Sequence, residues 1–229
     1  MNDLYPAFLK LKDRPCLVVG GGEIATRKLK HLLKANSRIV MVSHEFSAEI
    51  KQLAKEFPIL LIQQSFNEAI FELAVLEHLY LIIAATDNKE INQQVSESAQ
   101  ARTIWVNVVD DLQFSTFIMP AVIDRSPLLI AISSSGVSPV LSRMIREKIE
   151  WLLPKSLGLL LEKLHILRPL VKKKFSDIKQ KRDFSEWFLE GVLKDENQLS
   201  KDSVIWFDEY KKSLNKSQQG KVYLVGAGP

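Results

Sequence analysis

The sequence of 229 residues has a single cysteine, Cys16, which excludes an internal disulfide and a zinc site built on paired cysteines. Its four histidines are too scattered to suggest a metal site: they are His31, His44, His78 and His165. The low content of glycine and proline, 9 residues of each, excludes a collagen-like or linker-like chain. No apolar run approaches the roughly 20 residues of a membrane span. We therefore expect a cytoplasmic protein with no dedicated metal site and no association with a membrane.

The charge is modest overall but unevenly distributed. Hydrophobic residues make up 46% of the chain and charged residues 25%, and the net charge is +4, which is an ordinary globular balance and too mild by itself to indicate nucleic-acid binding. The segment 143–182 contains twelve lysines or arginines and four acidic residues, so it carries +8 and the rest of the chain −4. This segment is either a set of solvated helix faces or an attractor for a polyanion, with nucleic acid and a polycarboxylate both open.

Short apolar runs alternate with amphipathic stretches over the first half of the chain. The expected strands are residues 14–20, 38–42, 59–62, 79–85 and 103–109, and the expected helices are residues 24–34, 47–57, 67–76 and 88–101. Strands that alternate with helices predict a parallel sheet with right-handed crossovers. The fold class is therefore α/β, with a Rossmann-like parallel sheet.

The pattern changes after Asp110. Residues 114–122 and 128–133 resemble two strands joined by a turn at 124–127, which predicts a β-hairpin. From residue 140 to about 213 the chain is typical of helices, with breaks expected near Pro154, Pro169 and Asp183, and residues 214–220 resemble a linker. The predicted organisation is a Rossmann domain over 1–113, a hairpin and helix over 114–150, a helical domain over 151–213, and a linker with a new strand over 214–229.

A glycine-rich turn follows the first strand and opens the first helix. It contains Gly20-x-Gly22-x-x-Ala25, in which the first glycine permits a tight turn, the second admits a pyrophosphate close to the backbone, and the small third residue packs the helix on the sheet. The start of the helix then offers free N–H groups and a positive dipole to phosphates. The position within a βαβ unit favours dinucleotide binding over a merely structural turn.

The end of the second strand bears on the choice of cofactor. An acidic residue there binds the ribose hydroxyls of NAD, whereas NADP usually requires a nearby arginine. His44 and Glu45 follow the strand and no arginine comes closely after them, which favours NAD. Glu45 is equally well explained as a cap or first-turn acid of the next helix.

Two further polar groups follow the fourth and fifth strands, at the edge where such sheets bind ligands. Thr86 and Asp87 come first, and Asp87 is also a candidate N-cap of the following helix. Asn107, Asp110 and Asp111 close the fifth strand. A carboxylate at this edge would face the nicotinamide region, where a general base belongs, although a solvated strand end gives the same pattern.

A serine- and glycine-rich loop over residues 133–138 precedes the first helix of the second half. Such a loop can bind an anion through its backbone amides. Ser138 and Pro139 are also explained as the cap and first residue of that helix, which leaves the serines at 133–135 without a structural reason.

Taken together, these stretches resemble one family closely. The runs CLVVGGGEIATRK, AATDN, NVVDD and FIMPAVIDRSPLLIAISSSGVSPVLSR are similar to the N-terminal half of the siroheme synthase family, which is its precorrin-2 dehydrogenase and sirohydrochlorin ferrochelatase module. The final KVYLVGAGP resembles the start of the methyltransferase half that follows in the fused enzymes. The resemblance is strong over residues 1–150 and looser over 151–215.

The resemblance implies a two-step chemistry on a tetrapyrrole. NAD takes a hydride from precorrin-2, and ferrous iron, a substrate, then enters sirohydrochlorin, with an aspartate at the place of Asp110 serving as base in both steps. The implied cofactor-binding residues are Gly20, Gly22, Glu23, Ile24, Ala25, His44, Glu45, Thr86 and Asp87. The implied substrate-binding residues are Asn107, Ser134, Arg143, Arg146, Lys172, Lys173 and Lys174, since the tetrapyrrole carries carboxylates that suit the basic segment.

The resemblance also implies partners and leaves alternatives. A homodimer through residues 114–150 and a fused methyltransferase half are expected, and nucleic acid is not. Ser134 corresponds to a serine phosphorylated in one branch of the family, but Ser135 stands where that branch has glycine, which argues against modification. A regulatory module that senses NAD without catalysis, and a dehydrogenase without chelatase activity, are the other hypotheses. The sequence does not distinguish iron from cobalt.

Overall fold

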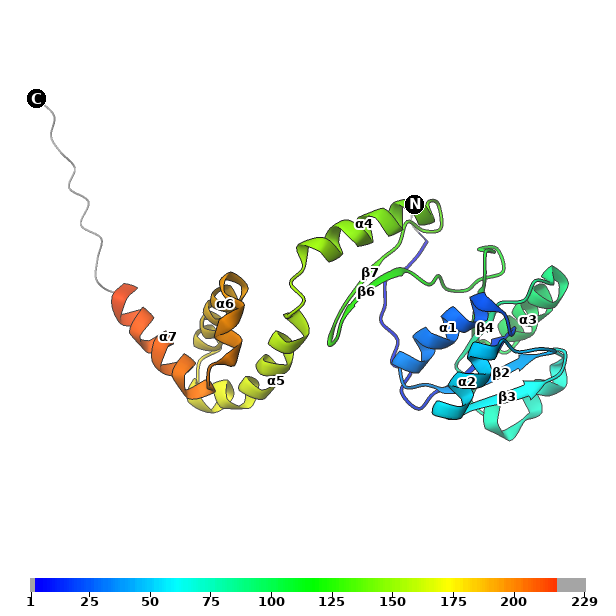
Figure 1. Cartoon of the computed structure of the whole chain (residues 1–229), viewed down its shortest axis with the longest axis horizontal. Helices are drawn as coiled ribbons and strands as arrows, with labels where there is room; N and C mark the ends of the chain where they lie inside the picture. Colours follow the sequence, from blue (N-terminus) through cyan, green and yellow to red (C-terminus); the bar gives the residue numbers. More distant parts are fainter. Residues whose placement is uncertain (1–2, 218–229) are drawn as a thin grey trace, which may run out of the picture. The chain divides into compact units, whose positions relative to one another are not determined.

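The computed structural model describes residues 3–217, and these form two compact units (Figure 1). The first unit comprises the chain up to Pro120 together with Ser133–Pro139. The second unit comprises Ala121–Ile132 and the chain from Val140 onward.

The first unit is built on a five-stranded sheet in which all strands are parallel and the order is β3-β2-β1-β4-β5. Its strands are β1 (Pro15–Val19), β2 (Arg38–Ser43), β3 (Ile59–Gln63), β4 (Leu81–Ala84) and β5 (Trp105–Val108). Its helices are α1 (Glu23–Lys34), α2 (Ala48–Glu56) and α3 (Lys89–Ala101). The predicted Rossmann-like sheet is therefore confirmed.

Alternate residues of the buried strands point to opposite faces of the sheet, and each face is covered by helices. Leu17 and Val19 of β1 pack in one cluster with Val95 and Ala99 of α3. Cys16 and Val18 pack in the other cluster, together with Ala25, Leu29 and Leu32 of α1 and Ile50 of α2. Helices α1 and α2 thus share one face and α3 covers the other.

Two expected elements differ from those observed. The helix expected over 67–76 is a pair of short 3₁₀ helices, η1 (Glu68–Glu72) and η2 (Ala74–Leu76). The strand expected from residue 114 was wrong for 114–120, because most of the hydrogen bonds that join this segment to β5 use side-chain hydroxyl groups, and the backbone bond from the Thr116 N–H to the Val106 carbonyl does not by itself make a ladder. The backbone N–H of Val106 donates to Thr116 Oγ1 and that of Val108 donates to Ser115 Oγ. The strand proper begins later, as β6 (Ala121–Arg125), and pairs with β7 (Leu128–Ile132) in the predicted antiparallel hairpin.

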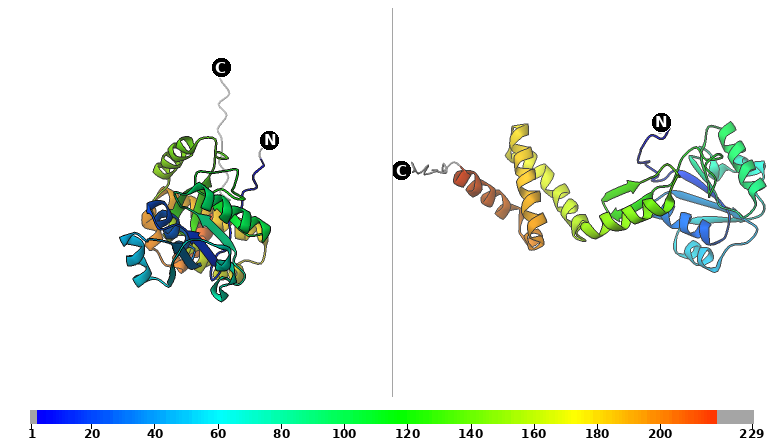
Figure 2. Two further views of the ribbon diagram at one scale, coloured as in Figure 1. Left: turned by 90° about the vertical axis from the view of Figure 1, so that its right-hand side faces the viewer. Right: turned by 90° about the horizontal axis from the view of Figure 1, so that it is seen from above.

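The rest of the second unit is helical (Figure 2). Its elements are α4 (Pro139–Leu152), α5 (Leu157–Lys174), α6 (Ile178–Lys194), η3 (Glu196–Ser200) and α7 (Ser203–Ser217). The aromatic side chains of Phe184, Phe188 and Trp206 form its core together with Leu160 and Leu167 of α5. The predicted helical C-terminal part is confirmed.

The break expected near Pro154 separates α4 from α5, but the breaks expected at Pro169 and Asp183 were wrong. Pro169 lies inside α5 and Asp183 inside α6. Proline removes the hydrogen bond to the carbonyl four residues earlier. Here that residue is His165, which is exposed together with Pro169, so water can satisfy the carbonyl and the helix continues.

Part of the expected linker is also helical, because α7 extends through residues 214–217. The remaining residues of the linker and the strand predicted at 221–229 lie outside the described residues. Among the helices of residues 3–217, none is both long and apolar enough to cross a bilayer.

Candidate functional site

The strand register brings the predicted polar motifs to one edge of the sheet. Val19 at the end of β1 pairs with Val42 of β2 and Ala84 of β4, and Ala84 pairs with Val108 of β5. The residues that follow these four strands therefore begin at the same level. This carboxyl edge is where sheets of this topology bind their ligands.

The three glycines after β1 have different surroundings. Gly20 has a φ of +131°, and a Cβ added to it would lie 2.2 Å from the carbonyl oxygen of Ala85. A Cβ on Gly21 would lie 1.8 Å from the carbonyl oxygen of Glu45. A Cβ on Gly22 would meet no atom within 4 Å. The first two glycines are thus required by the packing of the protein, whereas the third faces open space.

The start of α1 suits a phosphate group. Gly22 occupies the N-cap position, and no side chain caps the helix there. The first backbone N–H groups of a helix lack intrahelical partners and carry the positive end of its dipole. Because the cap residue has no side chain to fill the space, a pyrophosphate can approach these groups, and the residues present fit a dinucleotide.

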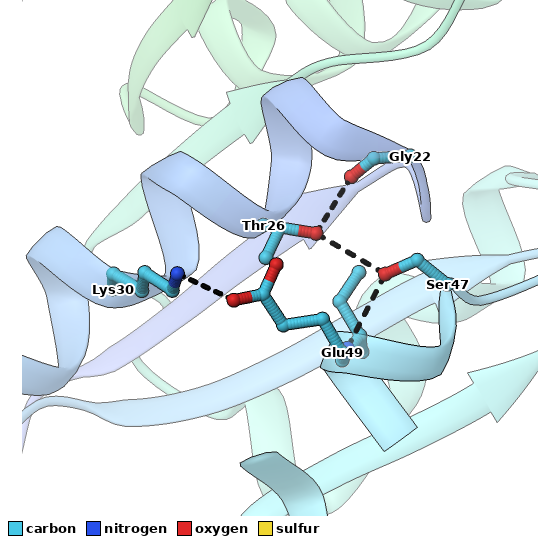
Figure 3. Close-up of polar contacts among 6 residues, drawn as sticks. Gly22, Thr26, Lys30, Ser47 and Glu49 are labelled. Carbon is cyan, nitrogen blue, oxygen red and sulfur yellow. Dashed lines mark hydrogen bonds and ion pairs between the residues drawn. The ribbon is translucent and has the colours of Figure 1, made fainter. Parts of the chain in front are cut away.

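A small polar network fixes α1 to α2 beside this turn (Figure 3). Thr26 Oγ1 donates to the Gly22 carbonyl at 2.9 Å and lies 3.2 Å from Ser47 Oγ. Ser47 Oγ in turn caps α2 by accepting from the Ile50 N–H, and Lys30 pairs with Glu49 at 2.5 Å. The glycine turn is therefore held from the helix side as well as from the strands.

The alternative role of Glu45 as a cap was wrong, because Ser47 caps α2 and the first-turn acid is Glu49. The side chain of Glu45 is exposed, next to the glycine turn that its backbone contacts. His44 is exposed too, and its Nε2 atom forms a hydrogen bond with Ser65 Oγ at the end of β3.

Thr86 is half-buried and forms a structural network with the buried Asn92. Its N–H and hydroxyl both donate to Asn92 Oδ1, at 3.2 and 2.7 Å, and Asn92 Nδ2 donates back to its carbonyl at 2.9 Å. The prediction that Asp87 caps the following helix was wrong, because Asn88 accepts from the Glu90 and Ile91 N–H groups. Asn88 reaches these groups because it directly precedes the first helical residue. Asp87 is left exposed at the carboxyl edge.

The two adjacent aspartates after β5 have different environments. Asp111 Oδ1 accepts from the Gln113 N–H at 3.0 Å and from the Phe114 N–H at 3.4 Å, so its carboxylate stabilises the turn. Asp110 is exposed, has a φ of +59°, and makes no hydrogen bond within the described part of the chain. Asn107 is buried and its Nδ2 atom donates to the Phe117 carbonyl. Of the two aspartates, Asp110 is the one whose carboxylate is exposed and free of hydrogen bonds within the described residues.

Lys28 was not singled out in the sequence, yet it lies near enough to Asp110 for their charges to interact. It is half-buried on α1, and burial and the neighbouring Arg27 lower its pKa while the charge of Asp110 raises it. Asn92 was also missed. The sequence held a signal for each residue. Asn92 is a polar residue on the side of a predicted helix that faces the sheet, and Lys28 is a lysine at the border of such a side, where a buried polar group needs a partner.

The serine-rich loop lines a cavity of about 680 Å³ within the first unit. Its lining residues are Asp3, Leu4, Leu112, Ser115, Thr116, Phe117, Ile118, Ser134, Ser135 and Val137. The Ser134 hydroxyl accepts from the Ser138 N–H and donates to the Ser138 carbonyl, at 3.0 and 2.9 Å. Pro139 is the first residue of α4, as expected.

The five predicted basic residues all lie in the second unit. Arg143 and Arg146 are on α4, where both approach Glu147 within 4 Å. Lys172, Lys173 and Lys174 are exposed in the last turn of α5, where positive charge also complements the helix dipole. Within residues 3–217, no three His, Cys, Asp or Glu side chains are grouped so that they could hold a metal ion.

The sheet order, the glycine turn and the uncapped start of α1 define a dinucleotide-binding protein of the Rossmann-like class. A family model for NAD(P)-binding domains matches residues 7–121, half of the chain, and the chain belongs to this family. A second model, described as sirohaem biosynthesis protein central, matches residues 125–151.

The relatives carry names that agree with these models. The chain is 42% identical over 229 residues to a siroheme synthase of Methylobacillus flagellatus and 41% identical over 235 residues to one of Ruthia magnifica. These alignments cover 99% and 100% of the chain but 48% of each relative, so the chain spans about half the length of the curated relatives it matches. Among solved structures it is similar to SirC, a precorrin-2 dehydrogenase, with a TM-score of 0.68 and 26% identity over 93% of this chain and 100% of that one.

Proposed function

We propose that this chain catalyses the NAD-dependent oxidation of precorrin-2 to sirohydrochlorin, a step of siroheme biosynthesis. One observation carries the proposal: the exposed, unbonded carboxylate of Asp110 lies at the edge of the sheet that also presents the glycine turn. The similarity to a precorrin-2 dehydrogenase and to siroheme synthases over nearly the whole chain supports the choice of substrate.

The reaction removes one hydride and one proton from the macrocycle. Bound NAD supplies the hydride acceptor. Asp110 would take the proton, because a carboxylate within reach of the reacting carbon acts as a general base. Gly20, Gly22, Glu23, Ile24 and Ala25 would hold the pyrophosphate, and Thr86 and Asp87 would line the cofactor site beyond it.

NAD rather than NADP is the proposed cofactor. Glu45 offers an exposed carboxylate beside the glycine turn, which suits the ribose hydroxyls and repels a 2′-phosphate. His44 is adjacent to it on the same loop.

The same base would serve a second step, the insertion of ferrous iron into sirohydrochlorin. Metal insertion must remove two pyrrole N–H protons, and an exposed carboxylate suits that task as well as the first. Iron is a substrate here, taken up by the nitrogen atoms of the macrocycle. Asn107, Ser134, Arg143, Arg146 and the lysines at 172–174 would help to hold the tetrapyrrole and its carboxylates.

We also propose that the chain acts as a cytoplasmic homodimer joined to a methyltransferase half, and that residues 114–150 form the dimer interface. Support comes from the exposed apolar side chains of α4, among which Val140 is 57% exposed, Met144 48% and Ile145 38%. Such a face on one helix is typical of an interface between subunits.

The proposal is tested by an anaerobic assay of the purified chain with precorrin-2 and NAD, followed by ferrous iron, with absorption spectra recorded throughout. We expect NADH and sirohydrochlorin first, and then the spectrum of the metallated product. Binding of NAD without turnover would instead support a regulatory module. Turnover without metallation would support a dehydrogenase that lacks chelatase activity.

A further inference from the structure

We propose that Lys28 is the residue that positions the carboxylate of Asp110 for proton transfer. This inference rests on the proposed role of Asp110 as base, and it assigns a second charged residue to the same site.

The side chain of Asp110 lacks a hydrogen bond that would hold it. The neighbouring Asp111 is fixed by two backbone N–H groups. Asp110, in contrast, is exposed on a left-handed turn and accepts no hydrogen bond from residues 3–217. A base must be held close to its productive geometry to be effective, so another group has to restrain this carboxylate.

The phase of α1 directs Lys28 toward the β5 side of the sheet. Thr26 and Lys30 both face α2, through Ser47 and Glu49 (Figure 3). Lys28 is two residues from each of them, which is about 200° around the helix and therefore on the opposite flank. Since α2 packs against β3, at the far end of the strand order β3-β2-β1-β4-β5, the opposite flank of α1 points to β4 and β5.

The turn that carries Asp110 lies on the same face of the sheet as α1. Val109, the preceding residue, packs against the core cluster that contains Ala25 and Leu29 of α1. Helix phase and strand order thus place Lys28 on the flank of α1 that faces the turn of Asp110, in agreement with the attraction between their charges.

Lys28 occupies this position at a cost to the fold. It is half-buried, and both burial and the adjacent Arg27 disfavour its charged form. A lysine kept in such a place without a structural ion pair is characteristic of a functional site. A purely structural role would predict the opposite, namely that its removal destabilises the protein.

The test compares Lys28→Met, Lys28→Arg and the control Lys30→Met, which removes the same charge from the other flank of α1. We expect Lys28→Met to lower kcat for precorrin-2 oxidation about tenfold or more, with an unchanged KM for NAD and a melting temperature no lower than wild type. Lys28→Arg should recover most of the loss, and Lys30→Met should keep kcat. In an Asp110→Ala background, Lys28→Met should cause no further loss.

Three outcomes would overturn the inference. If Asp110→Ala is inactive while Lys28→Met retains wild-type kcat, Lys28 has no part in catalysis although the base is correct. If Lys28→Met loses activity and stability together and arginine does not restore either, its role is structural. Full activity of Asp110→Ala would reject the base itself, and the positioning role with it.

Discussion

The α-carbon of Gly21 faces the carbonyl oxygen of Glu45 so closely that a Cβ at this position would lie 1.8 Å from that oxygen. The turn after β1 and the loop after β2 are therefore packed backbone to backbone. The Ser47 N–H reinforces this contact by donating to the Gly21 carbonyl at 2.9 Å. The turn at the end of β1 therefore sets the position of the loop after β2, and Glu45 on that loop would meet the ribose.

The glycine turn allows stability and cofactor binding to be separated by two matched variants. Gly21→Ala should destabilise the fold by about 2–4 kcal/mol, because its Cβ meets backbone that cannot move freely. Gly22→Ala should leave the melting temperature unchanged, since its Cβ enters open space, but should weaken NAD binding about tenfold or more by occupying the approach of the pyrophosphate. Thermal denaturation and calorimetric titration with NAD measure the two effects. Normal NAD affinity in Gly22→Ala would contradict this assignment of the phosphate site.

The paired aspartates provide the test of the proposed base. Asp110→Asn keeps a side chain that tolerates the left-handed turn, and it should reduce both activities by about 10²–10⁴-fold while the fold and NAD binding persist. Asp111→Ala removes the acceptor for the N–H groups of Gln113 and Phe114, and should cost about 1 kcal/mol of stability with little change in kcat. Steady-state kinetics and melting curves of both variants check this. If Asp111→Ala loses more kcat than Asp110→Asn, then Asp111 rather than Asp110 is the base.

The buried thiol of Cys16 predicts a loss of stability at alkaline pH. Burial raises its pKa from 9.0 to about 11, although a hydrogen bond with Ser37 acts in the opposite direction. The unfolded chain therefore ionises first, so the contribution of this group is complete below pH 9 and is lost as the pH rises toward 11. The loss should be of the order of 2 kcal/mol.

Urea denaturation between neutral and alkaline pH measures this effect, with Cys16→Ala as the control that lacks this titration. The two proteins should converge in stability as the pH rises. The folded wild type should also react slowly with a thiol reagent near neutral pH, since the thiolate is the nucleophile and Cys16 is buried. A parallel pH dependence of both proteins would show that Cys16 does not contribute.

The apolar face of α4 predicts self-association of this chain. Sedimentation should show a dimer at micromolar concentration, and Met144→Glu should shift it toward monomer, because a charge at a buried interface is left without a partner. Leu60→Glu is a control, since Leu60 is 44% exposed on β3, away from the proposed interface in sequence. A wild-type protein that is monomeric throughout would refute the proposed dimer.

The sequence alone determined the parts of this fold that depend on short-range patterns. Apolar runs such as that of β4, bounded by polar residues, identify buried parallel strands. The Gly20–Ala25 turn identifies the crossover into α1, because its residue types satisfy local steric demands whatever the rest of the chain does. The ligand-binding edge follows from the general rule that parallel α/β sheets bind ligands at the carboxyl ends of their strands.

Tertiary structure decided the roles that depend on contacts between distant segments. Asp110 and Asp111 are chemically identical neighbours, and only the turn that bonds Asp111 to the N–H groups of Gln113 and Phe114 leaves Asp110 free. Residues 115 and 116 join β5 through their hydroxyl groups, which no periodicity predicts. Lys28 comes within electrostatic range of Asp110 because helix phase and strand order act together across more than eighty residues of chain. Each of these roles is set by a geometry that only the assembled sheet and its helices create.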